Sequence, residues 1–157
     1  MTDLDEKDLA ILAQLQRDAQ TSSLELGDRL GMSSSQIGRR RQRLEAAGYI
    51  LSTPSRLNPE LLGLAVQAFI QIKTDAQTRT THGAISDLAK AQPQIMAAWT
   101  LTGDYDYIFR VYCSDLAALN DLVQTVLLPH PSIGHVQSQI VMEQIKDDTA
   151  LPLPKVR

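Results

Sequence analysis

Residues 22–48 read SSLELGDRLGMSSSQIGRRRQRLEAAG and contain the starts and ends of two helices. Ser22 and Ser33 are each followed three residues later by Glu or Gln, the spacing of a capping box at a helix start. Gly31 and Gly48 follow the two apolar patterns and suit left-handed helix ends. The pattern predicts a short helix, a tight glycine turn and a longer arginine-rich helix, which is the layout of a helix-turn-helix.

The longer helix, predicted over residues 33–47, carries the candidate DNA contacts. Ile37 and Leu44 lie about 20° apart on a helical wheel and define its buried side. Opposite them lie arginines, glutamines and serines, which suit the edges of bases, while Arg40 and Arg41 on the flanks suit phosphates. A solvated helix face is the alternative interpretation of such a cluster. The predicted DNA-binding residues are Ser34, Ser35, Gln36, Arg39, Arg40, Arg41 and Arg43.

Charge is distributed unevenly along the chain. The net charge of the 157 residues is −3, yet four arginines fall between positions 39 and 43. Another helix, predicted over about residues 5–17, precedes the helix-turn-helix. It places Asp8 on the same side as Ile11, Leu12 and Leu15. Residues 1–50 therefore form the predicted DNA-binding domain. This domain has a local basic patch although the net charge of the whole chain is negative.

After Gly48 the pattern changes from helices to strands. Prolines within residues 51–62 indicate an extended linker. Apolar residues then alternate from Val66, and two amphipathic stretches interrupt the strands predicted near 66–73, 95–101, 107–113 and 133–145. The order βαββαβ predicts a ferredoxin-like domain over 63–157, so the fold class is α+β with an N-terminal, winged-helix-like helix-turn-helix domain. Its open sheet face predicts a dimer.

Composition excludes several classes of protein. The single cysteine, Cys113, closes no intrachain disulfide, and the scattered histidines lack zinc-ligand spacing, so we expect no metal and no cofactor. The acidic start is unlike a signal peptide, and no apolar run reaches the roughly 18 residues of a membrane helix. We expect a cytoplasmic protein without a membrane partner.

The sequence resembles the Lrp/AsnC, or feast/famine, family of bacterial transcription regulators over nearly its whole length. The matching residues in the first half include Leu4-Asp5 with Asp8, Arg43-Leu44-Glu45 and Gly48-Tyr49-Ile50. In the second half they include 102–107 (TGDYDY) and 140–143 (IVME). The resemblance implies a non-enzymatic regulator of duplex DNA, dimers that assemble further, often to octamers, and an amino-acid effector bound between dimers near the glycine-aspartate turn. Arg41 departs from the pattern, which usually has an aliphatic residue there.

The turn at residues 103–106 is the candidate effector site. From the residues alone, Gly103-Asp104 is a common hairpin turn and the neighbouring tyrosines pack. The resemblance implies instead that turn amides hold the carboxylate of an effector and that an aspartate or carbonyl receives its ammonium. It also implies an effector role for Ser138, whose alternative is a hydroxyl satisfied within the sheet. The predicted effector-binding residues are Gly103, Asp104, Tyr105, Asp106 and Ser138.

Two other functions stay open at this point. Some tetrapyrrole-processing decarboxylases resemble the same two-part architecture, and that hypothesis needs histidine and arginine around a large cavity, for which His130 and His135 are the only candidates. A third possibility is an effector-binding or assembly module whose helix-turn-helix no longer binds DNA. The departure from the family pattern at Arg41 is the feature that suggests this loss. Loss of DNA binding on replacing Arg39 and Arg43 together would separate the regulator from this module.

Overall fold

The computed structural model describes residues 4–147 and 150–154, and the chain divides into two units. A helical unit contains the chain up to Arg56 together with the segment from Lys146 onward, and a sheet unit contains Leu57–Ile145. The sequence-based boundaries, 1–50, 51–62 and 63–157, place the C-terminal segment in the second domain. The difference arises because a short extended tail has no periodicity that would assign it to either core.

The tail contacts the first helix of the helical unit. The Leu151 amide donates to Gln16 Oε1 at 2.6 Å, and the Leu151 carbonyl accepts from Gln16 Nε2 at 3.3 Å. Leu153 packs against the core of the same unit. One glutamine amide therefore satisfies both backbone groups of a tail residue, while the neighbouring leucine adds apolar contact.

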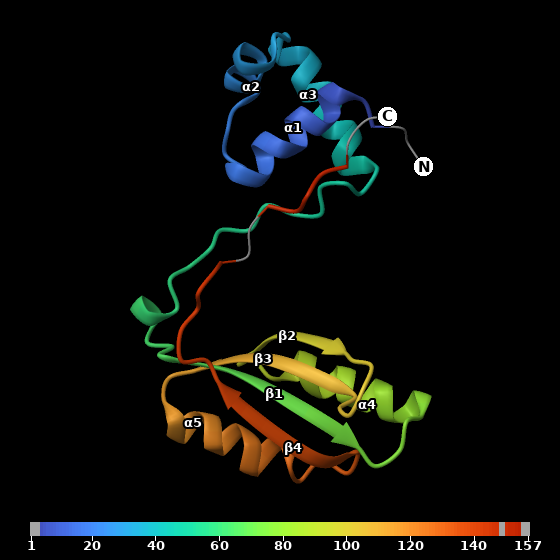
Figure 1. Cartoon of the computed structure of the whole chain (residues 1–157), viewed down its shortest axis with the longest axis vertical. Coiled ribbons are helices and arrows are strands. Elements are labelled where there is room, and N and C mark those ends of the chain that lie inside the picture. The colour runs from blue at the N-terminus through green and yellow to red at the C-terminus, as the bar shows by residue number, and fades with distance from the viewer. Residues whose placement is uncertain (1–3, 148–149, 155–157) are drawn as a thin grey trace. The chain divides into compact units, whose positions relative to one another are not determined.

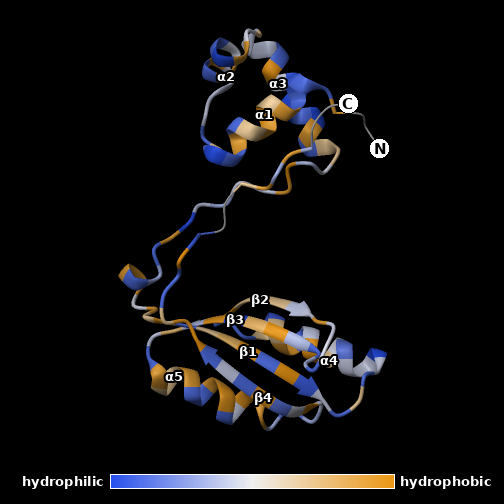
Figure 2. Ribbon diagram, in the orientation of Figure 1, coloured by the Kyte–Doolittle hydropathy of each residue, from blue (hydrophilic) through white to orange (hydrophobic). Residues whose placement is uncertain are grey.

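The helical unit consists of α1 (Glu6–Arg17), α2 (Ser23–Leu30) and α3 (Ser34–Ala46) (Figure 1). Both predicted capping boxes are confirmed, since Ser22 and Ser33 each accept the amide of the residue three positions later at 3.2 Å. Each helix carries apolar residues beside polar ones (Figure 2). The buried core consists of Ile11, Leu12, Leu15, Leu26, Ile37 and Leu44.

Glycines end both helices of the helix-turn-helix. Gly31 has φ +64° and ends α2, and Gly48 has φ +77° directly after the last turn of α3. The Tyr49 amide then donates to the Leu44 carbonyl at 2.9 Å, and the Gly48 amide donates to the Glu45 carbonyl at 3.0 Å. This Schellman motif satisfies carbonyls at the end of α3 and confirms the predicted stop.

The sheet unit has the predicted ferredoxin-like order βαββαβ. Four antiparallel strands follow the spatial order β2-β3-β1-β4. Ala68, Ile70, Phe109 and Val111 are buried in a core to which α4 and α5 also contribute. The elements are β1 (Val66–Thr74), α4 (Arg79–Ala91), β2 (Ile95–Thr100), β3 (Tyr107–Cys113), α5 (Leu116–Asp121), the π-helical segment η2 (Leu122–Leu127) and β4 (Ile133–Ile140).

Two sequence-based predictions need correction in the sheet unit. The last strand ends at Ile140 and not at residue 145. Ile140 pairs with Ala68, so in this register residues 143–145 lie beyond the start of β1 at Val66, and the Val141 amide makes one further bond, 2.9 Å to the Gln67 carbonyl. The linker is not extended throughout, since the 3₁₀ turn η1 (Glu60–Leu62) follows Pro59. Pro59 has φ −63°, which suits a helical start.

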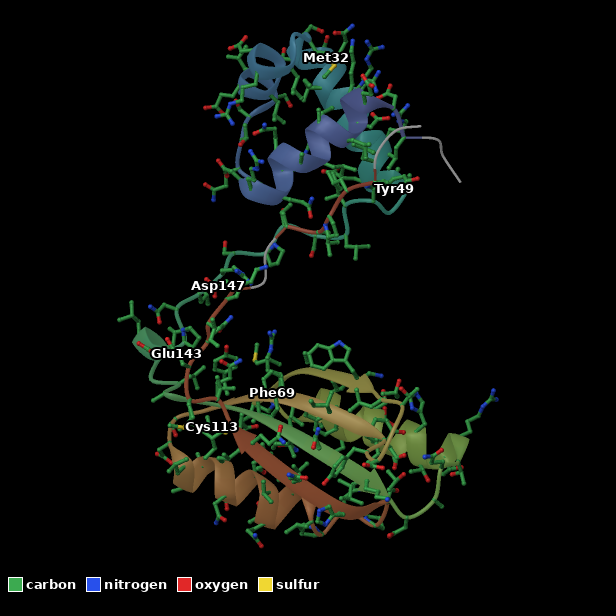
Figure 3. All side chains as sticks on the ribbon, viewed as in Figure 1. Met32, Tyr49, Phe69, Cys113, Glu143 and Asp147 are labelled. Carbon is green, nitrogen blue, oxygen red and sulfur yellow. The ribbon has the colours of Figure 1, made fainter. Side chains whose placement is uncertain are left out.

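The second face of the sheet carries a mixture of apolar and polar residues. Strand alternation places Phe69 on the face opposite buried Ala68 and Ile70 (Figure 3). Trp99 pairs with Ile108 in register, and its side chain is 47% exposed. Large apolar side chains in an accessible sheet face are the usual mark of an association surface.

Candidate functional site

The first turn of α1 places two carboxylates beside the arginines of α3. Asp5 is the N-cap of α1 and accepts the Asp8 amide at 2.8 Å, while Asp8 accepts the Asp5 amide at 3.2 Å. This reciprocal pair is a third capping box, built from two aspartates. It fixes the Asp8 carboxylate, which is fully buried, on the side of α1 that meets α3.

Two arginines of α3 converge on these carboxylates. Arg40 Nη1 donates to Asp5 Oδ2 and to Asp8 Oδ1, both at 2.7 Å. Arg43 Nη2 donates to Asp8 Oδ2. The side chains of Arg40 and Arg43 are 26% and 47% exposed. The network therefore orients both arginines from the protein side and leaves part of each guanidinium accessible to an external anion.

Hydrogen bonds shift the ionisation of this network. The Asp8 backbone amide, with the Arg40 side chain as second cause, lowers the pKa of Asp5 below its ordinary value. The Asp5 carboxylate, followed by Asp8, raises the pKa of Arg40. Both shifts favour the charged forms, so Asp5 and Arg40 stay ionised across the physiological range of pH.

The remaining polar residues of α3 face solvent. Ser34, Ser35, Gln36 and Arg39 are all exposed. A polar hollow of about 320 Å³ lies between α1 and α3, with Met32 from the turn between α2 and α3 at its border (Figure 3). The hollow is lined by Lys7, Met32, Gln36, Arg39, Arg40 and Arg43. Four cationic side chains around one hollow make a surface suited to phosphate groups.

Arg41 contacts its own helix. Its Nε donates to Glu45 Oε1 at 3.1 Å, an i,i+4 pair, and the arginine side chain is 27% exposed. The stem is thus largely covered, as for the aliphatic residue that the family resemblance implies, while the guanidinium ends beside a carboxylate. Its predicted phosphate contact stays a prediction.

The two predicted aspartates in the turn between β2 and β3 have different surroundings. Asp106 Oδ2 accepts both the Thr74 amide and the Thr74 hydroxyl at 2.7 Å, and Asp106 Oδ1 accepts from Gln77. The Thr74 amide is the main cause of the lowered pKa of Asp106. Asp104, in contrast, is exposed. Asp106 therefore anchors the turn to the end of β1, and Asp104 is the carboxylate accessible from solvent.

Backbone conformation leaves amides of the turn accessible. Gly103 has φ +118°, a conformation that glycine adopts without strain. In the described part of the chain, no hydrogen bond uses the amides of Gly103, Asp104 or Tyr105. Three consecutive amides next to a positive-φ glycine resemble an anion-binding nest.

Gln137 of β4, which was not among the predicted site residues, contacts the turn. The Tyr105 hydroxyl donates to Gln137 Oε1, and the Tyr105 ring lies 6.2 Å from the ring of His135. Ser138 follows Gln137 and lies on the other face of β4, since strand side chains alternate. Within one chain the structure thus brings Gly103, Asp104, Tyr105 and Asp106 together and leaves Ser138 apart.

The sequence signals for the missed residues differ. The Asp5-x-x-Asp8 spacing could have identified the first capping box, and a buried acid on an apolar helix side requires a cationic partner. Gln137 had no such signal, because its contact depends on a register across three strands. In the described residues, no group of three His, Cys, Asp or Glu could hold a metal, and no helix could span a membrane.

Comparisons with known proteins cover both units. Residues 4–45 match the AsnC-type helix-turn-helix domain, and residues 67–151 match the Lrp/AsnC ligand binding domain. The chain is 30% identical to the DNA-binding transcriptional activator DecR of Escherichia coli, covering 96% of this chain and 99% of DecR. It is 32% identical to the transcriptional regulator AzlB of Bacillus subtilis, with 98% of each chain covered.

A solved structure also matches the whole chain. It is a Neisseria meningitidis transcriptional regulator in complex with L-methionine. The two chains are 31% identical, the TM-score is 0.91, and the match covers 96% of this chain and 97% of the other. Similarity of this extent includes both the helical unit and the sheet unit.

Proposed function

This chain belongs to the Lrp/AsnC family of transcription regulators, and from that premise we propose that α3 contacts duplex DNA and that an amino acid at the turn 103–106 modulates the binding. The basic hollow beside α3 is the observation that carries the proposal. Exposed Arg39 and Gln36 are available to base edges, while Arg40 and Arg43 present guanidinium groups already oriented by aspartates. Contacts to phosphate and to bases are thereby divided among neighbouring side chains.

Replacing Arg39 with alanine tests the DNA contact. The variant should lose about tenfold in affinity for a duplex from its own upstream region and much less for an unrelated duplex, because a base contact is lost while the phosphate contacts remain. Arg17→Ala removes the same charge from the exposed end of α1 and serves as the control. Equal retention of DNA by the Arg39 variant and the wild type would favour an assembly module whose helix does not contact DNA.

The amino-acid effector follows from the turn. Free amides at Gly103–Tyr105 suit a carboxylate and exposed Asp104 suits an ammonium. A related regulator was crystallised with L-methionine, which supports this class of ligand. A thermal-shift screen of the amino acids should give at least one stabilising ligand, and Asp104→Asn should weaken it. No shift with any amino acid would contradict the proposal.

Dimerisation through the open sheet face completes the proposed mechanism. Phe69, Trp99 and Ile108 on this face would be covered by a second copy, and further assembly, to an octamer, would bring turns from neighbouring dimers and Ser138 together. Two α3 helices would then contact a pseudo-palindromic operator in the cytoplasm. Light scattering should show a dimer or larger species for the wild type and a smaller one for Phe69→Glu. A monomeric wild type would refute this arrangement.

Members of this family are regulators and not enzymes, and the decarboxylase alternative gains no support from its two candidate histidines. His130 Nδ1 accepts the Ser132 amide at 3.2 Å, and His135 lies beside Tyr105. Neither histidine lines the groove between α4 and β2. The regulator is therefore the function that we propose.

A further inference from the structure

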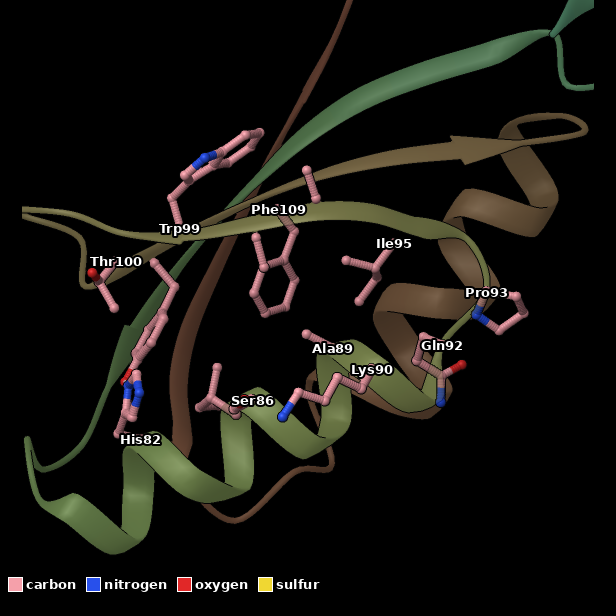
Figure 4. A pocket seen from close by; sticks show the side chains of 14 residues that line it. His82, Ser86, Ala89, Lys90, Gln92, Pro93, Ile95, Trp99, Thr100 and Phe109 are labelled. Carbon is pink, nitrogen blue, oxygen red and sulfur yellow. The ribbon is translucent and has the colours of Figure 1, made fainter. Parts of the chain in front are cut away.

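A groove of about 440 Å³ lies between α4 and the edge strand β2 (Figure 4). Phe109 and Ile95 project from the sheet into the groove, and Ala89 faces them from α4. This volume lies within the range of small-molecule sites in proteins, which are mostly apolar with a few polar groups. Its size and lining are those of a ligand site for a molecule with an apolar body.

The polar groups of the groove gather along α4. His82, Ser86 and Lys90 are spaced four residues apart and therefore share one helix face. In Figure 4 the Lys90 side chain extends along α4 towards Ser86. His82 Nδ1 lies 3.3 Å from the Tyr107 hydroxyl, and the two rings stack with centroids 6.1 Å apart, closing one end. The face thus provides an ammonium and a hydroxyl beside an aromatic wall.

The charges of the lining are of one sign. Lys90 is exposed, and in the described part of the chain no salt bridge engages its ammonium. Among the described residues that line the groove, none carries a carboxylate. An anion is therefore favoured by Lys90, whereas the ammonium of an amino acid would meet no acidic partner there. The turn site differs, because Asp104 offers a carboxylate.

We propose that this groove binds a small monocarboxylate with an apolar or aromatic body and no amino group. The carboxylate pairs with Lys90 and Ser86, and the body lies against the partly exposed Ile95 and Ala89. The site differs from the proposed amino-acid site in its polar groups, which are Lys90 and Ser86 of α4 and not the turn amides and Asp104. A single chain would thus distinguish an amino acid from a deaminated acid of similar shape.

Isothermal titration calorimetry provides the readout, because the ring of Trp99, the single tryptophan of the chain, lies on the opposite face of the sheet from the groove (Figure 4). Titration of the full-length protein with 3-phenylpropionate should give saturable binding with Kd below about 1 mM. The neutral 3-phenylpropanamide and L-phenylalanine should both bind at least about fivefold more weakly. No saturation up to about 10 mM, or equal binding of L-phenylalanine, would overturn the proposal.

Variants of the groove separate binding at Lys90 from binding elsewhere on the protein. Lys90→Met keeps the apolar stem and should raise Kd for 3-phenylpropionate about fivefold, whereas Lys90→Arg should retain binding. Arg79→Met removes an equal charge from the exposed start of the same helix and should leave Kd unchanged. Unchanged binding by Lys90→Met would exclude the assigned ion pair. The outcome is independent of DNA binding, so either proposal can fail alone.

Discussion

Replacing Asp8 with asparagine should destabilise the helical unit strongly. Asparagine has nearly the size of aspartate, so the change removes the charge and leaves the packing almost unaltered. Removing one member of a buried ion pair costs about 3–5 kcal/mol when its partner also stays buried. Arg40 and Arg43 are 26% and 47% exposed and regain water, so we expect about 2 kcal/mol. For a unit of this size that loss lowers Tm by roughly 8–16 °C.

Urea unfolding followed by circular dichroism measures the loss. The control is Asp28→Asn, which removes the same charge from an exposed position of α2. The Asp28→Asn substitution should change the free energy of unfolding by less than about 0.5 kcal/mol, as substitutions at exposed positions usually do. If the two variants unfold at the same urea concentration, Asp8 is not held by the arginines in solution, and the proposed orientation of Arg40 and Arg43 is wrong.

Two further predictions concern backbone packing and pH. A Cβ on Gly27 would lie 2.5 Å from the Met32 carbonyl oxygen, so Gly27→Ala should cost about 1–3 kcal/mol, whereas Gly38→Ala meets no atom within 4 Å and should gain about 0.5–1 kcal/mol. Thermal unfolding that gave both variants the same sign would contradict this reasoning. The lowered pKa values of Asp5 and Asp106 stabilise the fold above the ordinary carboxyl pKa of about 4, and this stability is lost as pH falls through the lowered values. Between about pH 5 and pH 2, the urea midpoint should therefore fall less in Asp106→Asn than in the wild type, and an equal fall would count against the Asp106 anchor.

Local signals predicted the elements of the fold because each depends on residues close in sequence. Capping serines, helix-ending glycines and strand alternation identified α2, α3 and the βαββαβ order. Boundaries set by distant partners were less accurate. The last strand stops at Ile140, two residues before its partner strand β1 runs out, and no pattern within residues 133–145 carries that information.

Among the site residues, those placed by local helical geometry were also predicted better than those placed by distant partners. The exposed side of α3 followed from helical geometry, so Gln36 and Arg39 were placed on the solvent side. Pairing of Arg40 with Asp5 joins positions 35 residues apart and requires the crossing of two helices. The separate roles of Asp104 and Asp106 likewise depend on Thr74, which residue type and turn spacing alone do not reveal.

The position of Leu153 bears on how the chain matures during synthesis. Leu153 packs on the helical core but follows the whole of the sheet unit in the chain. Residues 57–145 are therefore synthesised before this contact can form, and domains generally fold as units while the chain grows. The helical core thus gains one of its apolar side chains after the sheet unit has been made, although most of its residues are made first.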